Sequence, residues 1–359
     1  MADIVTFGEI MARMAPAGVL RLAQTLPGTL DVTFAGAEAN TAVSLALLGA
    51  SVDFVTALPH NPLADACLAS LRGTGVGVSQ VRRTDTGRLG IFFVETGANQ
   101  RPTQVHYDRD FSAISLAKPG DFNWPQILSG TRWLHITGIT AALTQSAAET
   151  TIQAAREAQR LGVHVSFDIN FRSRLWRWDK TPGPQLLARQ TLLQLLPHVS
   201  LWFCSEEDFA LLGLAPPTLN DESSKPRRLH EAARRIHQQY PNIRYFAGTF
   251  REQISASHNN WSGMLYDAPA DTAALAPLRD GVLLPWEIRQ IVDRVGSGDA
   301  FAAGILFGLT QPKIDLQYTI EFATAAGCLA HSVTGDWNYV SRGEIEDLMH
   351  GPGSGRVVR

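Results

Sequence analysis

Short apolar runs alternate with segments of helical periodicity along most of the chain. Strand-like runs rich in β-branched and aromatic residues occur at Ile4–Phe7, Val52–Thr56, Trp133–Ile136, Val163–Asp168, Ser200–Cys204 and Tyr245–Ala247. Segments of helical periodicity lie between them at Ala39–Leu48, Pro62–Leu71, Gln145–Leu161, Gln185–Leu196 and Arg228–Tyr240. This order is typical of βαβ units and predicts an α/β fold, a three-layer αβα sandwich around a mostly parallel sheet. In such sheets ligands bind beyond the carboxyl ends of the strands.

Two stretches depart from this alternation. Residues 10–35 and 86–112 contain strand-like segments without intervening helices, so we expect antiparallel strands that form a small sheet beside the main domain. The sequence thus predicts one domain over residues 1–350 with this β lid inserted in it. The glycine- and proline-rich end, residues 351–359, predicts a disordered tail.

Composition narrows the function classes. The 359 residues include 31 basic and 34 acidic side chains, for a formal net charge of −3. This balance argues against binding to nucleic acid or to an anionic membrane, which requires a clustered excess of Lys and Arg. The one basic cluster, Lys225–Arg228, lies in a polar stretch and is interpreted as a solvated loop.

Cysteine usage and the N-terminus indicate a soluble cytoplasmic protein. Cys67, Cys204 and Cys328 are widely spaced and odd in number, which gives neither a disulfide framework nor a metal-binding pattern. The chain starts directly with a strand-like segment and lacks the features of a signal peptide. No apolar run approaches the length of a membrane span.

The most informative segment is the turn Gly296-Ser297-Gly298-Asp299, which follows an apolar run and precedes a helical pattern. Glycines let successive N–H groups converge on one point, and the helix dipole adds partial positive charge there, which suits a phosphate. Asp299 has two interpretations: it caps the helix, or it accepts a proton from an attacking hydroxyl. From the turn alone, both remain open.

The same segment carries a family resemblance. Asp293-x-x-Gly296-x-Gly298-Asp299, followed by Ala-Phe-x-x-Gly304, resembles the C-terminal signature of the ribokinase-like (PfkB) carbohydrate kinases. The resemblance extends from Gly8 to about Met349. It implies that Asp299 is the catalytic base and that Gly296, Ser297 and Gly298 form an anion hole.

The substrate side resembles one branch of that family, the 2-keto-3-deoxygluconate kinases. The string Gly36-Ala-Glu-Ala-Asn40 is similar to their N-terminal signature, although a turn before an N-capped core helix is the alternative interpretation. Three further segments match: Tyr107-Asp-Arg109, Asp168-x-Asn170-x-Arg172 and Gly335-Asp336-Trp-Asn338. The resemblance implies substrate contacts from Gly36, Asn40, Tyr107, Arg109, Arg172 and Asp336. The planar guanidinium of arginine can donate two parallel hydrogen bonds to a carboxylate. Arg109 and Arg172 can alternatively lie at the surface or contact a phosphate. Glu9 follows a strand end and in principle faces the same substrate region, but a structural role for it is at least as plausible as a substrate contact.

The nucleotide side departs from the family pattern. The usual Asn-x-x-Glu motif is replaced by Ser205-Glu-Glu-Asp208, and the usual glycine-rich stretch over the ATP phosphates is replaced by Gly248–Arg251. The resemblance implies ATP and Mg²⁺ as cofactors, with Asp208 near the metal, although these acids can also simply begin a helix. ATP contacts are expected from Asn170, Ser205, Thr249, Arg251, Gly296, Gly298 and Asn338.

The predicted activity is ATP-dependent phosphorylation of 2-keto-3-deoxygluconate at its 6-hydroxyl. The alternatives are a kinase for fructose, ribose or another keto-deoxy sugar acid, and a non-catalytic sugar- or nucleotide-binding module. A nicotinamide dehydrogenase is disfavoured, because the glycine cluster Gly73–Gly77 follows a helix instead of a strand. Lid strands with exposed edges favour a homodimer formed through the lid.

Overall fold

The computed structural model describes residues 2–214 and 224–351, and its centre is a nine-stranded sheet. The strand order is β14-β13-β12-β11-β10-β9-β1-β4, with β17 paired to β13. The strands β4, β1, β9, β10, β11 and β12 pair in parallel, whereas β13, β14 and β17 are antiparallel. The strands are β1 (Ile4–Phe7), β4 (Val52–Val55), β9 (Trp133–Thr137), β10 (His164–Asp168), β11 (Leu201–Phe203), β12 (Tyr245–Ser255), β13 (His258–Asp267), β14 (Thr272–Ala276) and β17 (Trp286–Ile288).

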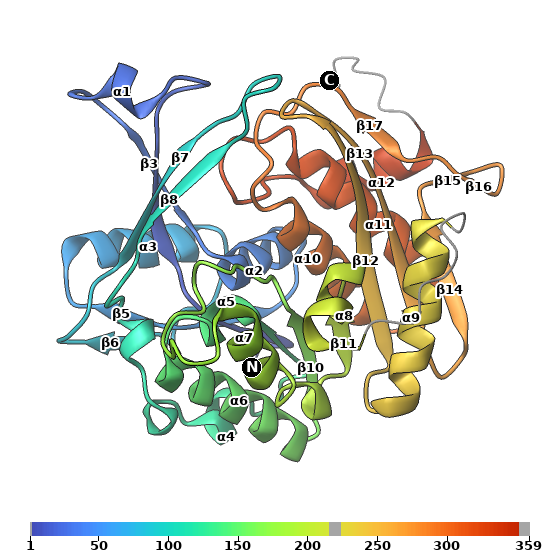
Figure 1. The fold of residues 1–359 in the computed structure, drawn as a ribbon, viewed down its shortest axis with the longest axis horizontal. Helices are drawn as coiled ribbons and strands as arrows, with labels where there is room; N and C mark the ends of the chain where they lie inside the picture. Colours follow the sequence, from blue (N-terminus) through green and yellow to red (C-terminus); the bar gives the residue numbers. More distant parts are fainter. Residues whose placement is uncertain (1, 215–223, 352–359) are drawn as a thin grey trace.

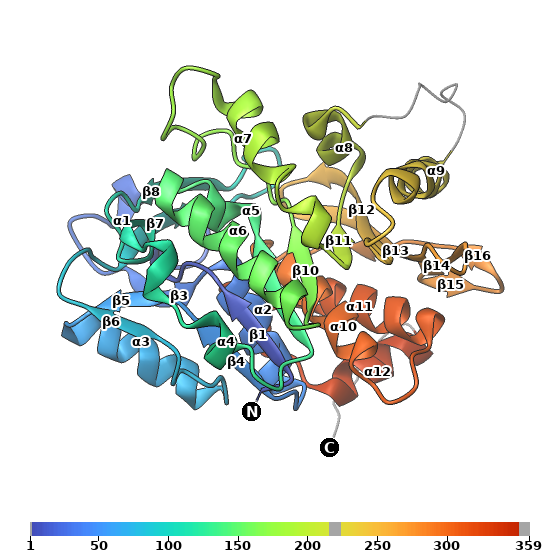
Figure 2. The same cartoon turned by 90° about the horizontal axis from the view of Figure 1, so that it is seen from below.

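Helices cover both faces of this sheet (Figure 2). One layer contains α2 (Ala37–Leu47), α3 (Pro62–Gly73), α10 (Ser297–Leu309), α11 (Leu316–Ala330) and α12 (Arg342–His350). The other contains α4 (Trp124–Ile127), α5 (Gly138–Ala141), α6 (Gln145–Arg160), α7 (Pro184–Leu192), α8 (Glu206–Leu212) and α9 (Lys225–Gln239). Strand side chains alternate between the two cores: on β1, Ile4 packs with the first layer, and Val5 and Phe7 with the second. The predicted three-layer α/β fold is confirmed.

A separate four-stranded sheet, the lid, stands at one side of α2 and α10, and the long β12–β13 hairpin stands at the other (Figure 1). The strand order of the lid is β3-β2-β7-β8. Its strands are β2 (Met11–Ala15), β3 (Asp31–Ala35), β7 (Gly90–Glu95) and β8 (Gln104–Asp108). The expectation of purely antiparallel strands is wrong for the central pair, because β2 and β7 run parallel. The expectation that helices are absent is also wrong, because α1 (Leu22–Thr25) makes one turn between β2 and β3.

Two local predictions need correction. The basic cluster Lys225–Arg228 is the first turn of α9 and not a loop, because Pro226 fits the first turn of a helix, where its missing N–H costs no hydrogen bond. The strand predicted at Tyr245–Ala247 continues to Ser255, since its pairing with β13 extends along polar residues whose side chains face solvent.

The remaining elements are short. They are η1 (Ile114–Leu116), η2 (Pro119–Asp121), η3 (Leu196–His198), and the two-stranded pairs of β5 (Ala57–Pro59) with β6 (Arg82–Thr84) and of β15 (Leu278–Arg279) with β16 (Val282–Leu283). Within residues 2–214 and 224–351, no helix is long and apolar enough to cross a membrane. The predicted tail beyond Gly351 lies outside the described residues.

Candidate active site

The turn before α10 leaves a helix N-terminus open. Gly296 is the N-cap with φ +88°, and a Cβ there would collide with the carbonyl oxygen of Asp336, so this position requires glycine. No side chain caps this N-terminus within the described chain, and a Cβ on the exposed Gly298 would meet no atom within 4 Å. The buried Ser297 hydroxyl donates to the carbonyl of Arg294 at 3.1 Å. The N–H groups of the first turn therefore remain available to an anion.

Asp299 lies on the first turn of α10 but is held by another helix. Its Oδ2 accepts a hydrogen bond of 2.7 Å from the side-chain amide of Asn40, on α2, and the amide oxygen of Asn40 accepts the N–H of Gly36 at 3.2 Å. Burial raises the pKa of Asp299 to about 7, and the Asn40 hydrogen bond opposes that shift. The carboxyl is half-buried and is therefore not sealed inside the core. The capping interpretation receives no support from these contacts.

Two further carboxylates gather at the ends of neighbouring parallel strands. Asp168 ends β10, and Asp208 lies in the first turn of α8, which follows β11; together with Gly298 they line one pocket of about 140 Å³. Burial raises the pKa of Asp168 to about 7, with further contributions from the charges of Asp208 and Asp299. Burial also raises the pKa of Asp208 to about 6. Sequence reasoning did not select Asp168, although its place at a strand end was a usable signal.

Asp208 also has the structural role that its sequence context allowed. Its Oδ2 accepts hydrogen bonds of 2.8 Å from both the N–H and the hydroxyl of Ser205, which completes a capping box on α8. Within the described residues, no three His, Cys, Asp or Glu side chains converge to hold a metal by themselves. Mg²⁺ commonly binds one or two carboxylates together with substrate phosphates. Asp168 and Asp208 fit that donor set.

The lid side contains a buried ion pair. Arg109, which follows β8, is bonded to Glu9, which follows β1, and both side chains are buried. The Arg109 guanidinium also lies over the half-exposed Tyr107 ring, 5.1 Å from its centroid. At Gly36 the backbone lies close to that of Glu9, and a Cβ there would collide with the Glu9 carbonyl oxygen. The structure therefore gives Glu9 a positioning role that the sequence left open.

Asp336, predicted as a substrate contact, belongs to a second buried ionic cluster. Arg13 on β2 bonds both Asp336 and Asp293, and all three residues are buried. Burial raises the pKa of Asp336 to about 6, and the charge of Arg13 opposes that shift. Asp293 additionally accepts N–H groups from Arg294 at 2.8 Å and from Gly335 at 3.3 Å. Arg13 thus joins the lid to the loops that hold the turn Gly296–Asp299, here called the phosphate turn.

The predicted nucleotide contacts are only partly brought together. Thr249, on β12, lines the pocket of Asp168 and Gly298, whereas Asn170 and Arg172 line an adjoining pocket of about 300 Å³ with Asp168 and Asp208. Arg251 is not among the residues lining either pocket; its guanidinium lies 6.0 Å from the centroid of the Trp261 ring. Asn338 is buried, and its amide donates a long hydrogen bond of 3.5 Å to the carbonyl of Ala326.

Comparison with known proteins agrees with this architecture. The profile described as "pfkB family carbohydrate kinase" matches residues 1–239. The chain is 29% identical to a 2-dehydro-3-deoxygalactonokinase of Haloferax volcanii over 99% of this chain and 98% of that protein. It is 28% identical to a 2-dehydro-3-deoxygluconokinase of Thermoproteus tenax, over 97% and 94%. The crystal structure of a 2-dehydro-3-deoxygluconokinase from Thermotoga maritima superposes with a TM-score of 0.86 at 39% identity, covering 98% of this chain and 100% of that one.

Fold and matches together define the class: the protein is a carbohydrate kinase with a ribokinase-like α/β fold. Within that class, the chain belongs to the pfkB family.

Proposed function

We propose that this kinase transfers the terminal phosphoryl group of ATP to the 6-hydroxyl of 2-keto-3-deoxygluconate, with Asp299 as general base. The observation that carries the proposal is the pairing of the open N-terminus of α10 with a half-buried carboxyl held by Asn40. The similarity to relatives named for 2-dehydro-3-deoxygluconate and 2-dehydro-3-deoxygalactonate supports a keto-deoxy sugar acid as substrate.

In the proposed reaction, the sugar hydroxyl attacks the terminal phosphorus of ATP. The new oxygen–phosphorus bond forms as the bond to the ADP oxygen breaks, and the hydroxyl proton passes to Asp299. The N–H groups of Gly296, Ser297 and Gly298 stabilise the charge on the moving phosphoryl group. When bound, Mg²⁺ would neutralise part of the negative charge of the ATP phosphates. Asp168 and Asp208 would hold it, and Thr249 and Asn170 would contact the nucleotide.

The substrate would lie between this turn and the lid. Asn40 and the backbone at Gly36 would bind hydroxyl groups, and Tyr107 would cover the sugar from the lid. Arg109 would donate hydrogen bonds to it while remaining bonded to Glu9. Closure of the lid over the sugar would exclude water, which otherwise competes for the phosphoryl group.

A panel assay tests the proposed substrate. ADP release is measured with 2-keto-3-deoxygluconate, its 4-epimer 2-keto-3-deoxygalactonate, fructose and ribose. We expect a kcat/KM for one of the two keto-deoxy acids that exceeds those for the neutral sugars by at least about 100-fold, because the loss of a paired charge costs several kcal/mol. Preference for fructose or ribose would contradict the proposal.

The pH dependence of turnover tests the proposed base. The pKa of Asp299 is raised to about 7 by burial, and a general base acts only when deprotonated. We therefore expect kcat to rise as pH increases from 5.5 through about 7 and to level off above it. Asp168, whose pKa is also raised to about 7, adds to the same trend. A kcat that falls over this range would contradict the assignment.

We further propose a cytoplasmic homodimer that pairs through the lid. The three cysteines are free, as expected in a reducing compartment. The outer lid strands β3 and β8 carry exposed apolar side chains, Val32 and Tyr107, at edges with no neighbouring strand in the described chain. A single species of 39.1 kDa in light scattering would contradict the dimer.

A further inference from the structure

A pocket of about 350 Å³, here called the amino-edge pocket, lies at the amino ends of the central strands. Three of its lining residues stand one residue before β9, β11 and β12; they are Arg132, Ser200 and Arg244. A fourth, His164, begins β10. These four strands are parallel neighbours, so their amino ends meet at one edge of the sheet. Asp168 ends β10 and therefore lies at the opposite edge, with the proposed active site.

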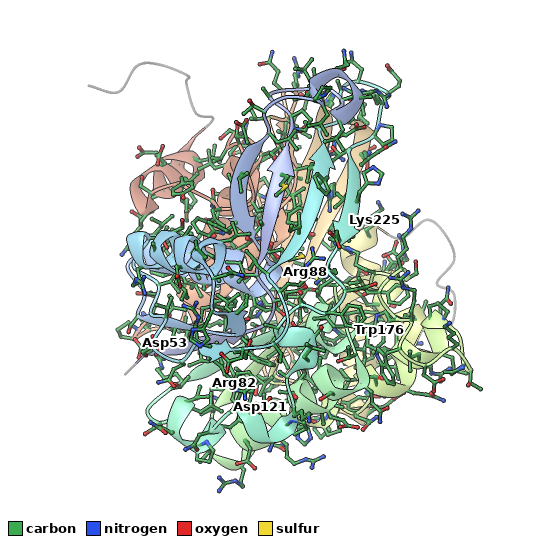
Figure 3. The ribbon with its side chains drawn as sticks, turned by 90° about the vertical axis from the view of Figure 1, so that its left-hand side faces the viewer. Asp53, Arg82, Arg88, Asp121, Trp176 and Lys225 are labelled. Atoms are coloured by element: carbon green, nitrogen blue, oxygen red, sulfur yellow. The ribbon has the colours of Figure 1, made fainter. Side chains whose placement is uncertain are left out.

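Arg132 has no carboxylate partner in the described chain. Its guanidinium donates a hydrogen bond of 2.7 Å to the carbonyl oxygen of Thr310, which follows α10, and it forms no ion pair within residues 2–214 and 224–351. A different arrangement occurs at Arg82, whose guanidinium lies 2.9 Å from a carboxylate oxygen of Asp121 (Figure 3). Arg132 thus brings to the pocket a positive charge that is not paired with a carboxylate.

The carboxylates around the pocket do not line it. Asp267 lies 3.2 Å from the guanidinium of Arg244, but this is the only hydrogen bond of that arginine side chain in the described chain, and the side chain is 55% exposed. Asp3 accepts the N–H of Arg132 with its backbone carbonyl, and its side chain is exposed. The carboxylate of Asp315 caps α11. Among the described residues, the lining of the pocket includes no acidic side chain.

The two arginines act on the same imidazole. Partial burial lowers the pKa of His164, and the charges of Arg244 and Arg132 lower it further. The ring lies against that of Trp133, with centroids 5.0 Å apart, and makes no hydrogen bond in the part of the chain that the structure describes. At pH 7 the imidazole is therefore neutral and has an N–H to donate. An anion between the two cations would relieve their mutual repulsion.

Uncharged donors and apolar side chains complete the pocket. Ser200 and Tyr245 line it, and neither hydroxyl makes a hydrogen bond within the described residues. Burial raises the pKa of Tyr245, which keeps its phenol protonated as a donor. The amide of Asn242 is already used, because it donates to two backbone carbonyls at 2.7 and 2.8 Å. Leu309 and Ile314 add an apolar side, so the pocket offers hydrogen-bond donors next to a small apolar surface.

This combination suits a phosphate ester better than a carboxylate. A phosphate monoester carries about 1.5–2 negative charges at pH 7 and has three terminal oxygens, whereas a carboxylate carries a single charge on two oxygens. Two guanidinium groups from separate strands can each bind phosphate oxygens with their planar forks. The volume of about 350 Å³ lies near the lower end of the range for small-molecule sites, about 300–1,000 Å³, and leaves room for a short carbon chain.

We propose that the amino-edge pocket binds a small phosphate ester, with the phosphate between Arg132 and Arg244. The carbon chain lies against Leu309 and Ile314. This site does not depend on the proposed function, because α10 separates it from the phosphate turn. The helix begins at Ser297, and its 13 residues span about 20 Å to Leu309 beside the pocket.

The test first removes the competing anion site. Gly298→Glu places a carboxylate at the phosphate turn, where a Cβ would meet no atom within 4 Å, so the fold is kept and anions are repelled from that turn. Binding of glucose 6-phosphate to this variant is then measured by calorimetry without nucleotide. Adding Arg132→Gln should raise the Kd at least about tenfold, because it removes a cation. Adding Ser200→Glu instead should have an effect of the same size, because it places a repelling charge in the pocket.

The matched control is Arg72→Gln in the Gly298→Glu protein. It removes an exposed arginine of α3 and should leave the Kd within about twofold. Urea denaturation of each variant should match that of its parent, since the replaced side chains are outside the core. Inorganic phosphate should bind at least about threefold more weakly than glucose 6-phosphate, because it has no carbon chain to cover the apolar side.

Three results would overturn the inference: a Kd of the Gly298→Glu protein for glucose 6-phosphate above about 10 mM, a Kd that neither Arg132→Gln nor Ser200→Glu changes, or inorganic phosphate that binds as tightly as the ester. Failure of the proposed function would look different. A wild-type protein that releases no ADP with any sugar acid would contradict phosphoryl transfer and leave these binding results as they are.

Discussion

We expect the replacement of Asp299 with Asn to lower kcat by about 10²–10⁴-fold, the usual contribution of a general base, while the protein stays folded. The amide keeps the shape of the side chain and still accepts or donates a hydrogen bond at Asn40, but it cannot take the proton of the attacking hydroxyl. In the proposed binding mode ATP contacts main-chain N–H groups that the substitution leaves in place, so KM for ATP should change little. Initial rates of ADP release at saturating substrate measure the effect.

The control for this prediction is Asp347→Asn, which makes the same chemical change at an exposed position on α12. Its kcat should match the wild type. An Asp299→Asn enzyme within about threefold of wild-type kcat, a difference of only about 0.7 kcal/mol, would remove Asp299 as the base.

We expect the replacement of Arg13 with Met to lower the free energy of unfolding by about 3–5 kcal/mol, because it leaves two buried carboxylates without their shared cation. Arg13 is 3% exposed, and Asp293 and Asp336 are 4% and 6% exposed. Urea denaturation measures the loss. Since Asp293 also accepts backbone N–H groups beside the phosphate turn, the folded fraction of this variant should have a lower kcat as well.

Arg88→Met is the matched control for Arg13→Met. It breaks the Arg88–Asp108 pair, whose side chains are 38% and 58% exposed, and exposed pairs contribute about 0–1 kcal/mol. Equal losses in the two variants would show that the buried triad is not what stabilises the junction between lid and main domain.

The features that the sequence predicted are those encoded by local pattern. The alternation of strands and helices followed from periodicity, and the turn at Gly296–Asp299 followed from glycine placement before a helix. Within that turn, position 296 requires glycine for two reasons. Its φ is +88°, and a Cβ there would collide with the carbonyl oxygen of Asp336. The resemblance of motif was enough to identify this position.

The features that the sequence did not predict depend on contacts between distant residues. Glu9 and Arg109 are 100 residues apart, and Arg13 lies 280 and 323 residues from its two partners. No spacing rule connects such residues before the fold brings them together. For the same reason, the sequence offered Arg109 as a free cation for a carboxylate, whereas the structure pairs it with Glu9. The parallel pairing of β2 with β7 was likewise invisible to local pattern.

The most direct test of Asp299 as the general base is a crystal structure with the sugar acid and a non-hydrolysable ATP analogue bound. We expect the 6-hydroxyl to lie within about 2.6–3.2 Å of a carboxylate oxygen of Asp299, with the terminal phosphate on the N–H groups of Gly296–Gly298. A complex in which that hydroxyl lies beyond hydrogen-bond reach of Asp299, or in which the phosphate lies away from the start of α10, would contradict it.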